Sequence, residues 1–382
     1  MKMFENIKVV VLVSVFLAFG LIVKPLALKA KQNNWNNVVL ASTNTDSKTD
    51  VEVGGGRYGV VYYNRREGNS EIYLSLVKLN GEKSGPEIRI TNDPGDSMDP
   101  VIIWNGEDFG IFWYESWNIY YARVSADGNV VQNKTLIESG GVHPSAVWNP
   151  SPEEYGLVWW GDNTLPGGAR FVRVSREGNV VGEVRALNSV NGGGYYRPRI
   201  DTDGAGFGVA WSDLRSCNGG CREVVFAYVN ADGEKAGDDV VLTSTGAEHL
   251  NSLVWNGNEF AMVSYGNGGI SIIRSDKDGN RLQFAPLTGN PPYNNNMGLA
   301  WNEDHYVLST IGISESGGSD IWLANYDRTG NIQGTFTRVS SSSGQDYYPS
   351  RPAVSGKDVA VAWVANLWEP DQNISFAIDR KY

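Results

Sequence analysis

Short runs of β-branched and aromatic residues recur along the chain, and each run is bounded by glycine, asparagine, aspartate or proline. The clearest example starts at Asp99, where apolar runs between residues 101 and 137 are interrupted by Asn105-Gly106 and Asp127-Gly128. Runs of this composition predict strands. Both dipeptides favour tight hairpin turns, because glycine tolerates the positive φ that such turns require. The stretch therefore predicts four short antiparallel strands.

This four-strand pattern returns about every 50 residues, which is the mark of a repeat architecture built from small antiparallel sheets. The repeats cover residues 50–91, 99–137, 144–187, 198–243, 251–287, 297–339 and 351–379. They predict an all-β, seven-bladed β-propeller of four-stranded antiparallel blades. Because the blades close into one ring, we expect a single domain over residues 31–382.

The last repeat has only three strands, and the N-terminal region supplies a spare one. Residues 37–43 read NVVLAST and match DVVLTST at 239–245, the predicted outer strand of the fourth repeat. We therefore expect the N-terminal strand to pair with the C-terminal blade and to close the ring. Such pairing removes open sheet edges that would otherwise invite aggregation.

Four tryptophans recur at one place in the repeat, beside the first hairpin turn: Trp104, Trp148, Trp255 and Trp301. A propeller blade packs against neighbours on both faces, so most of its aromatic residues are interpreted as packing between blades. A feature that repeats in several blades is architectural. A binding site is better sought where the blades differ.

The net charge is −11, and the chain contains 45 glycines and 13 tryptophans. This acidic balance argues against nucleic acid and against an anionic membrane surface, both of which attract basic proteins. It favours solubility and identifies no partner by itself.

Residues 1–30 have the outline of a secretory signal peptide. Lys2 and Lys8 precede an apolar run over residues 9–23, and Lys24-Pro25 ends it. The run is shorter than the roughly 20 residues of a membrane span, so cleavage is expected, with a retained N-terminal anchor as the alternative. Either outcome predicts a secreted or cell-envelope protein outside the cytoplasm.

The two cysteines, Cys217 and Cys221, flank Asn218-Gly219-Gly220. In an oxidising compartment they predict a disulfide that closes this loop. We expect no metal, because no second cysteine pair exists and the three histidines are scattered along the sequence. The stretches at 201–204 and 276–279 look faintly like calcium loops, but they lack the remaining ligands and are interpreted as hairpin turns.

Ligand contacts are expected on one face of the ring. The loops that enter the inner strands and the loops that join the second and third strands emerge there together and surround the central channel. The first group contributes the candidates Asp99, His143, Tyr195, Tyr196, Arg197, His249, Tyr347, Tyr348 and Arg351, and the second contributes Trp117, Asp213 and Arg215. Aromatic faces and forked arginine donors suit a sugar or a peptide. The alternative is that the aromatic residues cap the blade ends and that the charges are only solvated.

Catalysis is the weaker interpretation. Glycoside cleavage needs paired carboxylates, and lyase chemistry needs a base near a group that neutralises charge. Asp99, Glu115, Asp213, His143 and His249 are of the right types, but no spacing singles out a pair. No Gly-x-Ser-x-Gly elbow supports acyl transfer by serine. The catalytic residues, if any exist, stay unknown.

The repeat resembles those of secreted bacterial and archaeal propellers, which are TolB-like or WD40-like in outline. Their pattern, Trp-x-Asp-x-Arg followed by Ile-Tyr-x-x-Arg-Val-x-x-Asp-Gly, is similar to residues 211–215 and 119–128 here. The Trp-Asp ending of WD40 repeats and the Asp boxes of sialidases are missing. The resemblance implies the architecture only, since one fold carries many functions.

Together these patterns predict a monomeric binding module outside the cytoplasm, without a cofactor, that recognises a glycan or an extracellular protein on the channel face. The alternatives are a carbohydrate-active enzyme, either a polysaccharide lyase or a glycoside hydrolase, and a cell-surface scaffold.

Overall fold

The computed structural model describes residues 35–44, 47–161, 168–188, 197–214, 221–289, 296–313, 318–340 and 344–380. Those ranges contain strands and turns and no helix, and therefore no helix that could span a membrane. The predicted signal peptide at 1–30 lies outside the described residues and stays a prediction.

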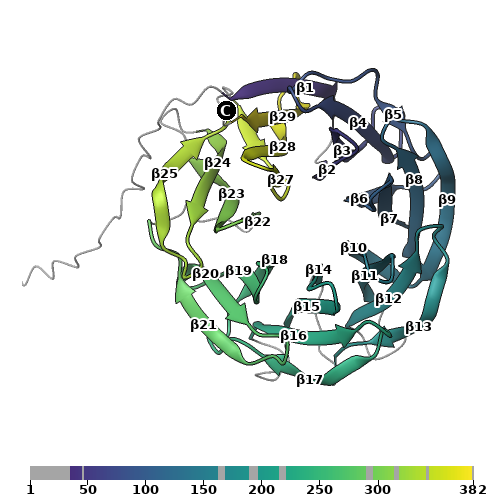
Figure 1. Ribbon diagram of the computed structural model, residues 1–382. Helices are drawn as coiled ribbons and strands as arrows, with labels where there is room; N and C mark the ends of the chain where they lie inside the picture. The colour runs from purple at the N-terminus through teal and green to yellow at the C-terminus, as the bar shows by residue number, and fades with distance from the viewer. Residues whose placement is uncertain are drawn as a thin grey trace, which may run out of the picture.

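Five four-stranded antiparallel sheets follow one another around a central opening (Figure 1). In each sheet the spatial order is the chain order, from an inner strand at the opening to an outer strand at the rim. The strands are β2 (Thr49–Gly54), β3 (Arg57–Asn64), β4 (Glu71–Lys78) and β5 (Ile88–Arg89); β6 (Ser97–Trp104), β7 (Asp108–Glu115), β8 (Asn118–Ser125) and β9 (Val130–Ser139); β10 (Gly141–Asn149), β11 (Glu154–Gly161), β12 (Ala169–Ser175) and β13 (Val180–Ala186); β14 (Arg199–Thr202), β15 (Gly206–Asp213), β16 (Glu223–Asn230) and β17 (Lys235–Val241); and β18 (His249–Trp255), β19 (Phe260–Gly266), β20 (Gly269–Ser275) and β21 (Arg281–Pro286).

A sixth, nine-stranded sheet completes the arrangement. It contains β1 (Asn36–Ser42), β22 (Gly298–Asn302), β23 (His305–Ile313), β24 (Ser319–Tyr326), β25 (Ile332–Arg338), β26 (Gln345–Tyr347), β27 (Ala353–Ser355), β28 (Asp358–Leu367) and β29 (Asn373–Asp379). The short strand β26 joins two sets by pairing with both β24 and β28. One set is β22 to β25. The other is β27 to β29 with β1, which pairs antiparallel with β29, Val38 opposite Phe376.

The chain is thus an all-β protein whose sheets are arranged as in a β-propeller. The N-terminal strand lies in the outer position beside the C-terminal strand, which is the pairing that the sequence suggested. A count of seven blades follows if the nine-stranded sheet is divided at β26, and it stays our interpretation of these sets.

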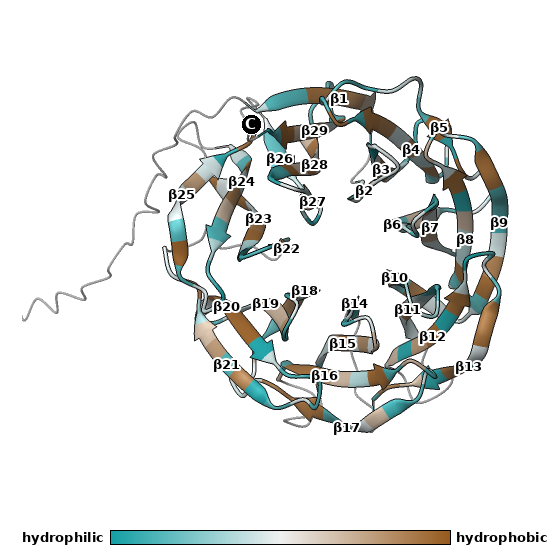
Figure 2. Ribbon diagram, in the orientation of Figure 1, coloured by the Kyte–Doolittle hydropathy of each residue, from teal (hydrophilic) through white to brown (hydrophobic). Residues whose placement is uncertain are grey.

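Neighbouring sheets pack through apolar residues of their second and third strands. Trp113, Trp159 and Trp211 occupy corresponding positions on β7, β11 and β15 and are completely buried. The outer strands are more polar, as the hydrophilic stretches along β13 and β17 show (Figure 2). Burial on both faces of the second and third strands explains why these sequences lack a polar face.

The recurring tryptophans have the packing role that the sequence predicted. Trp104, Trp148, Trp255 and Trp301 each pack against the aromatic residue that opens the next strand, with ring centroids 4.7–4.9 Å apart. Trp104 also covers Gly54 of the preceding sheet so closely that a Cβ atom on this glycine would collide with the indole. The repeated feature is therefore part of the scaffold.

The asparagine of the first hairpin turn joins adjacent sheets. Asn105 Oδ1 accepts the N–H groups of Glu107 and Asp108, while its Nδ2 donates to the Tyr155 hydroxyl in the next sheet at 2.8 Å. Asn256 repeats the arrangement and donates to the Tyr306 hydroxyl at 2.6 Å. Because both bonds are buried, this residue fixes the turn and the packing between sheets together.

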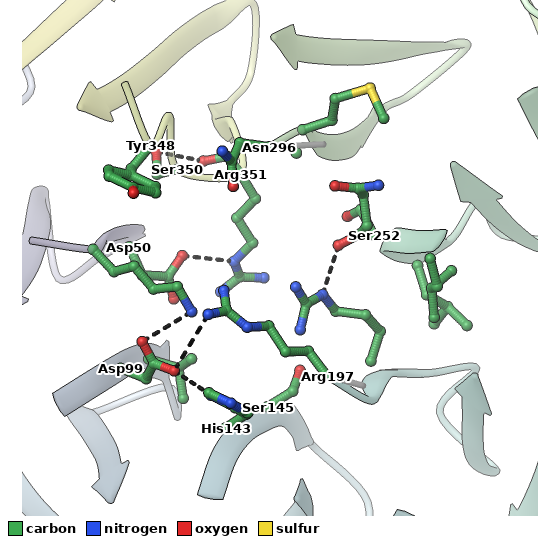
Figure 3. A pocket seen from close by; sticks show the side chains of 18 of the residues that line it. Asp50, Asp99, His143, Ser145, Arg197, Ser252, Asn296, Tyr348, Ser350 and Arg351 are labelled. Atoms are coloured by element: carbon green, nitrogen blue, oxygen red, sulfur yellow. Dashed lines mark hydrogen bonds and ion pairs between the residues drawn. The ribbon is translucent and has the colours of Figure 1, made fainter. Parts of the chain in front are cut away.

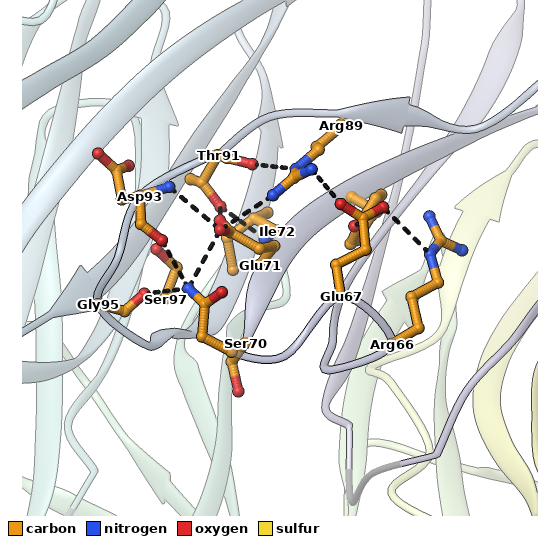
Figure 4. Close-up of polar contacts among 12 residues, drawn as sticks. Arg66, Glu67, Ser70, Glu71, Ile72, Arg89, Thr91, Asp93, Gly95 and Ser97 are labelled. Carbon is orange, nitrogen blue, oxygen red and sulfur yellow. Dashed lines mark hydrogen bonds and ion pairs between the residues drawn. The ribbon is translucent and has the colours of Figure 1, made fainter.

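A buried glutamate at the start of the third strand holds the segment that leads to the next inner strand (Figure 4). Glu71 accepts hydrogen bonds from the Thr91 hydroxyl and from Asp93 N, and Thr91 Oγ1 accepts from Ile72 N at 2.8 Å. Glu223 and Thr243 repeat the pattern. These contacts fix the path of the chain as it approaches the central opening.

Candidate functional site

A cavity of about 780 Å³ lies where the inner strands begin. Residues close to the starts of β2, β6, β10, β14, β18, β22 and β27 line it, so segments far apart in the sequence meet at one place (Figure 3). A concave site at the centre of a ring is a common place for a ligand. Seven of the residues selected from the sequence line this cavity: Asp99, His143, Arg197, His249, Tyr347, Tyr348 and Arg351.

Two other selected residues, Trp117 and Asp213, lie elsewhere. Trp117 is in the turn between β7 and β8 and is 44% exposed. Asp213 is buried at the end of β15, where its carboxylate accepts a hydrogen bond from Trp211 Nε1 at 3.0 Å. Neither residue lines the cavity. Tyr195, Tyr196, Arg215 and Cys217 lie outside the described residues, so the disulfide between Cys217 and Cys221 stays a prediction.

Asp99 is the centre of a charged cluster at one side of the cavity (Figure 3). Its carboxylate lies 2.9 Å from Lys48 Nζ and 3.8 Å from Arg197 Nη2, and it accepts a hydrogen bond from His143 Nδ1. Burial favours the neutral acid, but Lys48, the hydrogen bond from His143 and Arg197 outweigh that effect and hold the pKa of Asp99 well below its ordinary value. Asp99 is therefore ionised in the folded protein.

Lys48 loses its proton at a lower pH than an ordinary lysine. Burial, reinforced by the charge of Arg197, lowers the pKa of Lys48 to about 7, although Asp99 acts in the opposite direction. Burial also lowers the pKa of His143, against the opposing influence of Asp99. The cavity thus holds an amine that loses its proton near neutral pH, beside an imidazole whose neutral form is favoured by burial.

Arg351 is fixed by residues of β2 and β6, the strands that also begin near Lys48 and Asp99. Its guanidinium lies 2.7 Å from Glu52 and 3.3 Å from Asp50, and it donates to the carbonyl oxygen of Ile102 at 3.1 Å. Burial disfavours its charge, but the acidic neighbours prevail and raise the pKa of Arg351. Several contacts on one guanidinium hold it in a fixed orientation.

Arg199 is another basic residue of the cavity lining. It donates to the carbonyl oxygens of Asn251 at 2.6 Å and of Pro198 at 3.1 Å. Burial lowers the pKa of Arg199 to about 10, with a further contribution from the charge of Arg197. Carbonyl oxygens satisfy its donors but do not neutralise its charge.

The lining residues carry an excess of positive charge. Five of them are basic, namely Lys48, Arg197, Arg199, Arg222 and Arg351, whereas only Asp50 and Asp99 are acidic. Arg222 lies against the imidazole of His249. A positive cavity in a protein of net charge −11 indicates an anionic ligand, because the surrounding wall focuses the local field.

Three lining residues adopt a backbone conformation that is unusual for residues with a side chain. Asp99, His143 and Tyr348 have φ of 50°, 55° and 54°, and each is followed directly by proline. The strand register shifts around both Asp99 and His143. Such bulges redirect side chains and are frequent beside functional sites.

Sequence reasoning missed Lys48, Arg199 and Arg222. Lys48 lies at the start of the first inner strand, and Asp99 and His143 lie near the starts of theirs, so an alignment of the repeats at these positions could have found it. Arg199 lies two residues after Arg197, on the same side of an extended chain. Arg222 gave no such signal, since it precedes a third strand.

No family model and no curated protein sequence matches the chain. Among solved structures, it is similar to puromycin hydrolase, with a TM-score of 0.54 and 15% identity over 89% of this chain. It spans 53% of that protein, about half of its length. A prolyl endopeptidase gives 0.51 and 14% identity, over 90% of this chain and 51% of that one.

The β-propeller domain of the Trilobed protease from Pyrococcus furiosus matches over nearly its whole length. Its TM-score is 0.50 and its identity 9%, with 86% of this chain and 97% of that chain covered. Identities this low show a shared fold and nothing about shared chemistry. What the comparisons establish is that the described sheets are those of a β-propeller.

Proposed function

We propose that this protein is a binding module that takes the negatively charged part of a glycan or of a protein partner into the central cavity. The observation that carries the proposal is the excess of basic over acidic residues in the lining. Arginines held in place before a ligand arrives lose little side-chain entropy on binding, and they form strong charge-assisted bonds to carboxylates.

Arg197 offers the sharpest test. It lines the cavity, its side chain is 39% exposed, and its nearest acidic partner is 3.8 Å away, so Arg197→Gln leaves the fold intact. Calorimetric titration with glucuronate should show binding that weakens with added salt. The variant should lose about tenfold in affinity, the lower end of the range for a charged hydrogen bond.

The matched control is Arg185→Gln. Arg185 belongs to the outer strand β13 and pairs with Glu234, far from the cavity lining. Its replacement should leave the affinity unchanged. Binding of glucose as tightly as glucuronate, or equal effects of the two substitutions, would contradict the proposal.

The second candidate function is a polysaccharide lyase, and the cluster of Lys48, Asp99 and His143 favours it. In β-elimination a neutral amine takes the proton beside a uronate carboxylate, the C4–O bond breaks, and a C4=C5 double bond forms while the leaving oxygen takes up a proton. A lysine with a pKa of about 7 is suited to the first step. Mass spectrometry of acidic polysaccharides after incubation distinguishes the candidates, because unsaturated products arise only from the lyase.

A protein ligand remains the alternative to a glycan within the binding proposal. The similar structures include a prolyl endopeptidase and the propeller domain of a protease, proteins named for action on peptides. Location outside the cytoplasm, a monomeric state and the absence of a cofactor are part of the same proposal. Detection of the mature chain in a culture supernatant or envelope fraction tests the location.

A further inference from the structure

We propose that the ligand is an acidic oligosaccharide, and that it runs from the cavity across Tyr348 and Tyr347 onto Trp368. This inference rests on the proposed function, since it places the charged end of the ligand in the cavity. It adds a second subsite outside the cavity and commits to a chemical class, a chain of linked uronic acids.

Trp368 is the starting observation. Its side chain is 69% exposed, the largest exposed fraction among the large apolar side chains of the described ranges. The residue follows the end of β28, in the turn to β29, and therefore lies on the face where the chain enters the inner strands. A single exposed apolar residue is ordinary, but this one is held in a specific conformation.

The turn that contains Trp368 is fixed by hydrogen bonds. Trp368 and Asn366 have φ of 68° and 54°, which is costly for residues with a side chain. Trp368 N donates to Gln372 Oε1 at 3.3 Å, and Asn366 Nδ2 donates to Asp371 at 2.9 Å. Backbone bonds from Glu369 to Asn366 and from Gln372 to Glu369 complete it. The turn holds the indole at the surface, where most of it stays in contact with solvent.

An aromatic path leads from this indole into the cavity. The rings of Trp368 and Tyr347 lie 5.8 Å apart, and those of Tyr347 and Tyr348 lie 6.1 Å apart. Both tyrosines line the cavity, and Arg351 follows them in the same segment. The order in space is therefore exposed indole, two half-buried phenols, and then the basic lining.

A uronic acid matches both parts of this surface. Each of its rings combines a flat apolar C–H face with a carboxylate in one rigid unit, so consecutive residues can cover the aromatic path while one carboxylate reaches the arginines. An acidic peptide carries its charge on flexible side chains and has no flat apolar face. The observations thus favour the glycan.

The experiment measures how affinity depends on ligand length. Calorimetric titrations use monomers, trimers and hexamers of galacturonate, guluronate and glucuronate, with hexaglutamate as the acidic peptide. For the wild type, affinity should rise with length in at least one glycan series. Trp368→Ala should reduce hexamer affinity roughly three- to tenfold, the value of one aromatic contact, and leave monomer affinity unchanged. Trp368→Phe should retain much of the gain.

Ile313→Ala is the matched control, because Ile313 is also exposed and ends β23, the second strand of the adjacent set. It should leave every affinity unchanged. A length-independent affinity, a gain that survives in Trp368→Ala, or an equal Trp368-dependent gain with hexaglutamate would overturn the inference. Failure of every ligand to bind, the monomers and hexaglutamate included, would instead contradict the proposed function on which this inference rests.

Discussion

Replacing Asp99 by asparagine should have opposite effects on stability and on anion binding. The Asp99 carboxylate is shared by Lys48, His143 and Arg197. Asparagine has nearly the same shape but no charge, and its NH₂ group would face one of these donors. The variant therefore leaves three basic groups together without the anion that separates them.

The size of the stability loss follows from the proton that Lys48 can release. Removing one partner of a buried ion pair costs about 3–5 kcal/mol when the remaining charge is trapped. Lys48, however, has a pKa of about 7 with Asp99 present, and the loss of this carboxylate lowers that pKa further. The amine then becomes neutral at pH 7, so we expect a loss of about 2 kcal/mol, growing as the pH falls.

Urea unfolding followed by circular dichroism measures the loss, and titration with glucuronate measures the affinity. Because Asp99→Asn makes the cavity more positive, glucuronate should bind more tightly. Asp213→Asn is the control, since it removes another buried carboxylate that lies outside the cavity. It should reduce stability without improving affinity. Unchanged stability of Asp99→Asn, or weaker binding, would refute this view of the cluster.

Three further outcomes are expected. The pKa of Lys48 is about 7 in the folded protein and 10.5 in the unfolded chain. The free energy of unfolding should therefore rise between these pH values, by up to about 1.4 kcal/mol per pH unit. Lys48→Met should abolish that rise in urea titrations at several pH values. Thr91→Val should cost about 1–3 kcal/mol, because it leaves Ile72 N without its acceptor, and Thr243→Val should match it in thermal unfolding. Deleting β1 should expose the edge of β29 and cause concentration-dependent association in light scattering, and a fully monomeric deletion variant would contradict the role of this strand.

The fold could be predicted because its signals are local. Asn105-Gly106 predicts a hairpin turn from two adjacent residues, and similar turn dipeptides recur along the chain. The pairing of β1 with β29 joins strands that are more than 300 residues apart in the sequence, yet it could be predicted by counting strands and matching two short segments. The extra strand β26 was not predicted, because Gln345–Tyr347 has only three residues and its pairing with β24 depends on tertiary contacts.

The site was only partly predictable. The loops that face the opening follow from the order of strands in a blade, so Asp99, His143 and Arg351 were selected correctly as residues that meet there. Which side chains point inward depends on bulges such as the one beside Asp99. The proline that follows both Asp99 and His143 is typical of a bulge, but it was not interpreted in that way from the sequence. Asp213 was selected because it lies where the second strand leads into the loop to the third strand, but its carboxylate accepts a hydrogen bond from Trp211 and does not line the cavity.

The contrast between repeated and unrepeated residues locates the chemistry of this protein. Positions that keep their residue type, such as Asn105 and Asn256, bond within the scaffold. Positions at the start of the inner strands differ from sheet to sheet, as Lys48, Asp99 and His143 do, and these side chains contact one another. Because the sheets form a ring, the starts of all inner strands meet at one cavity. Differences in residue type between the repeats therefore place different side chains in a single site. For this reason, substitutions at the variable positions should change binding, whereas substitutions at the repeated positions should change stability.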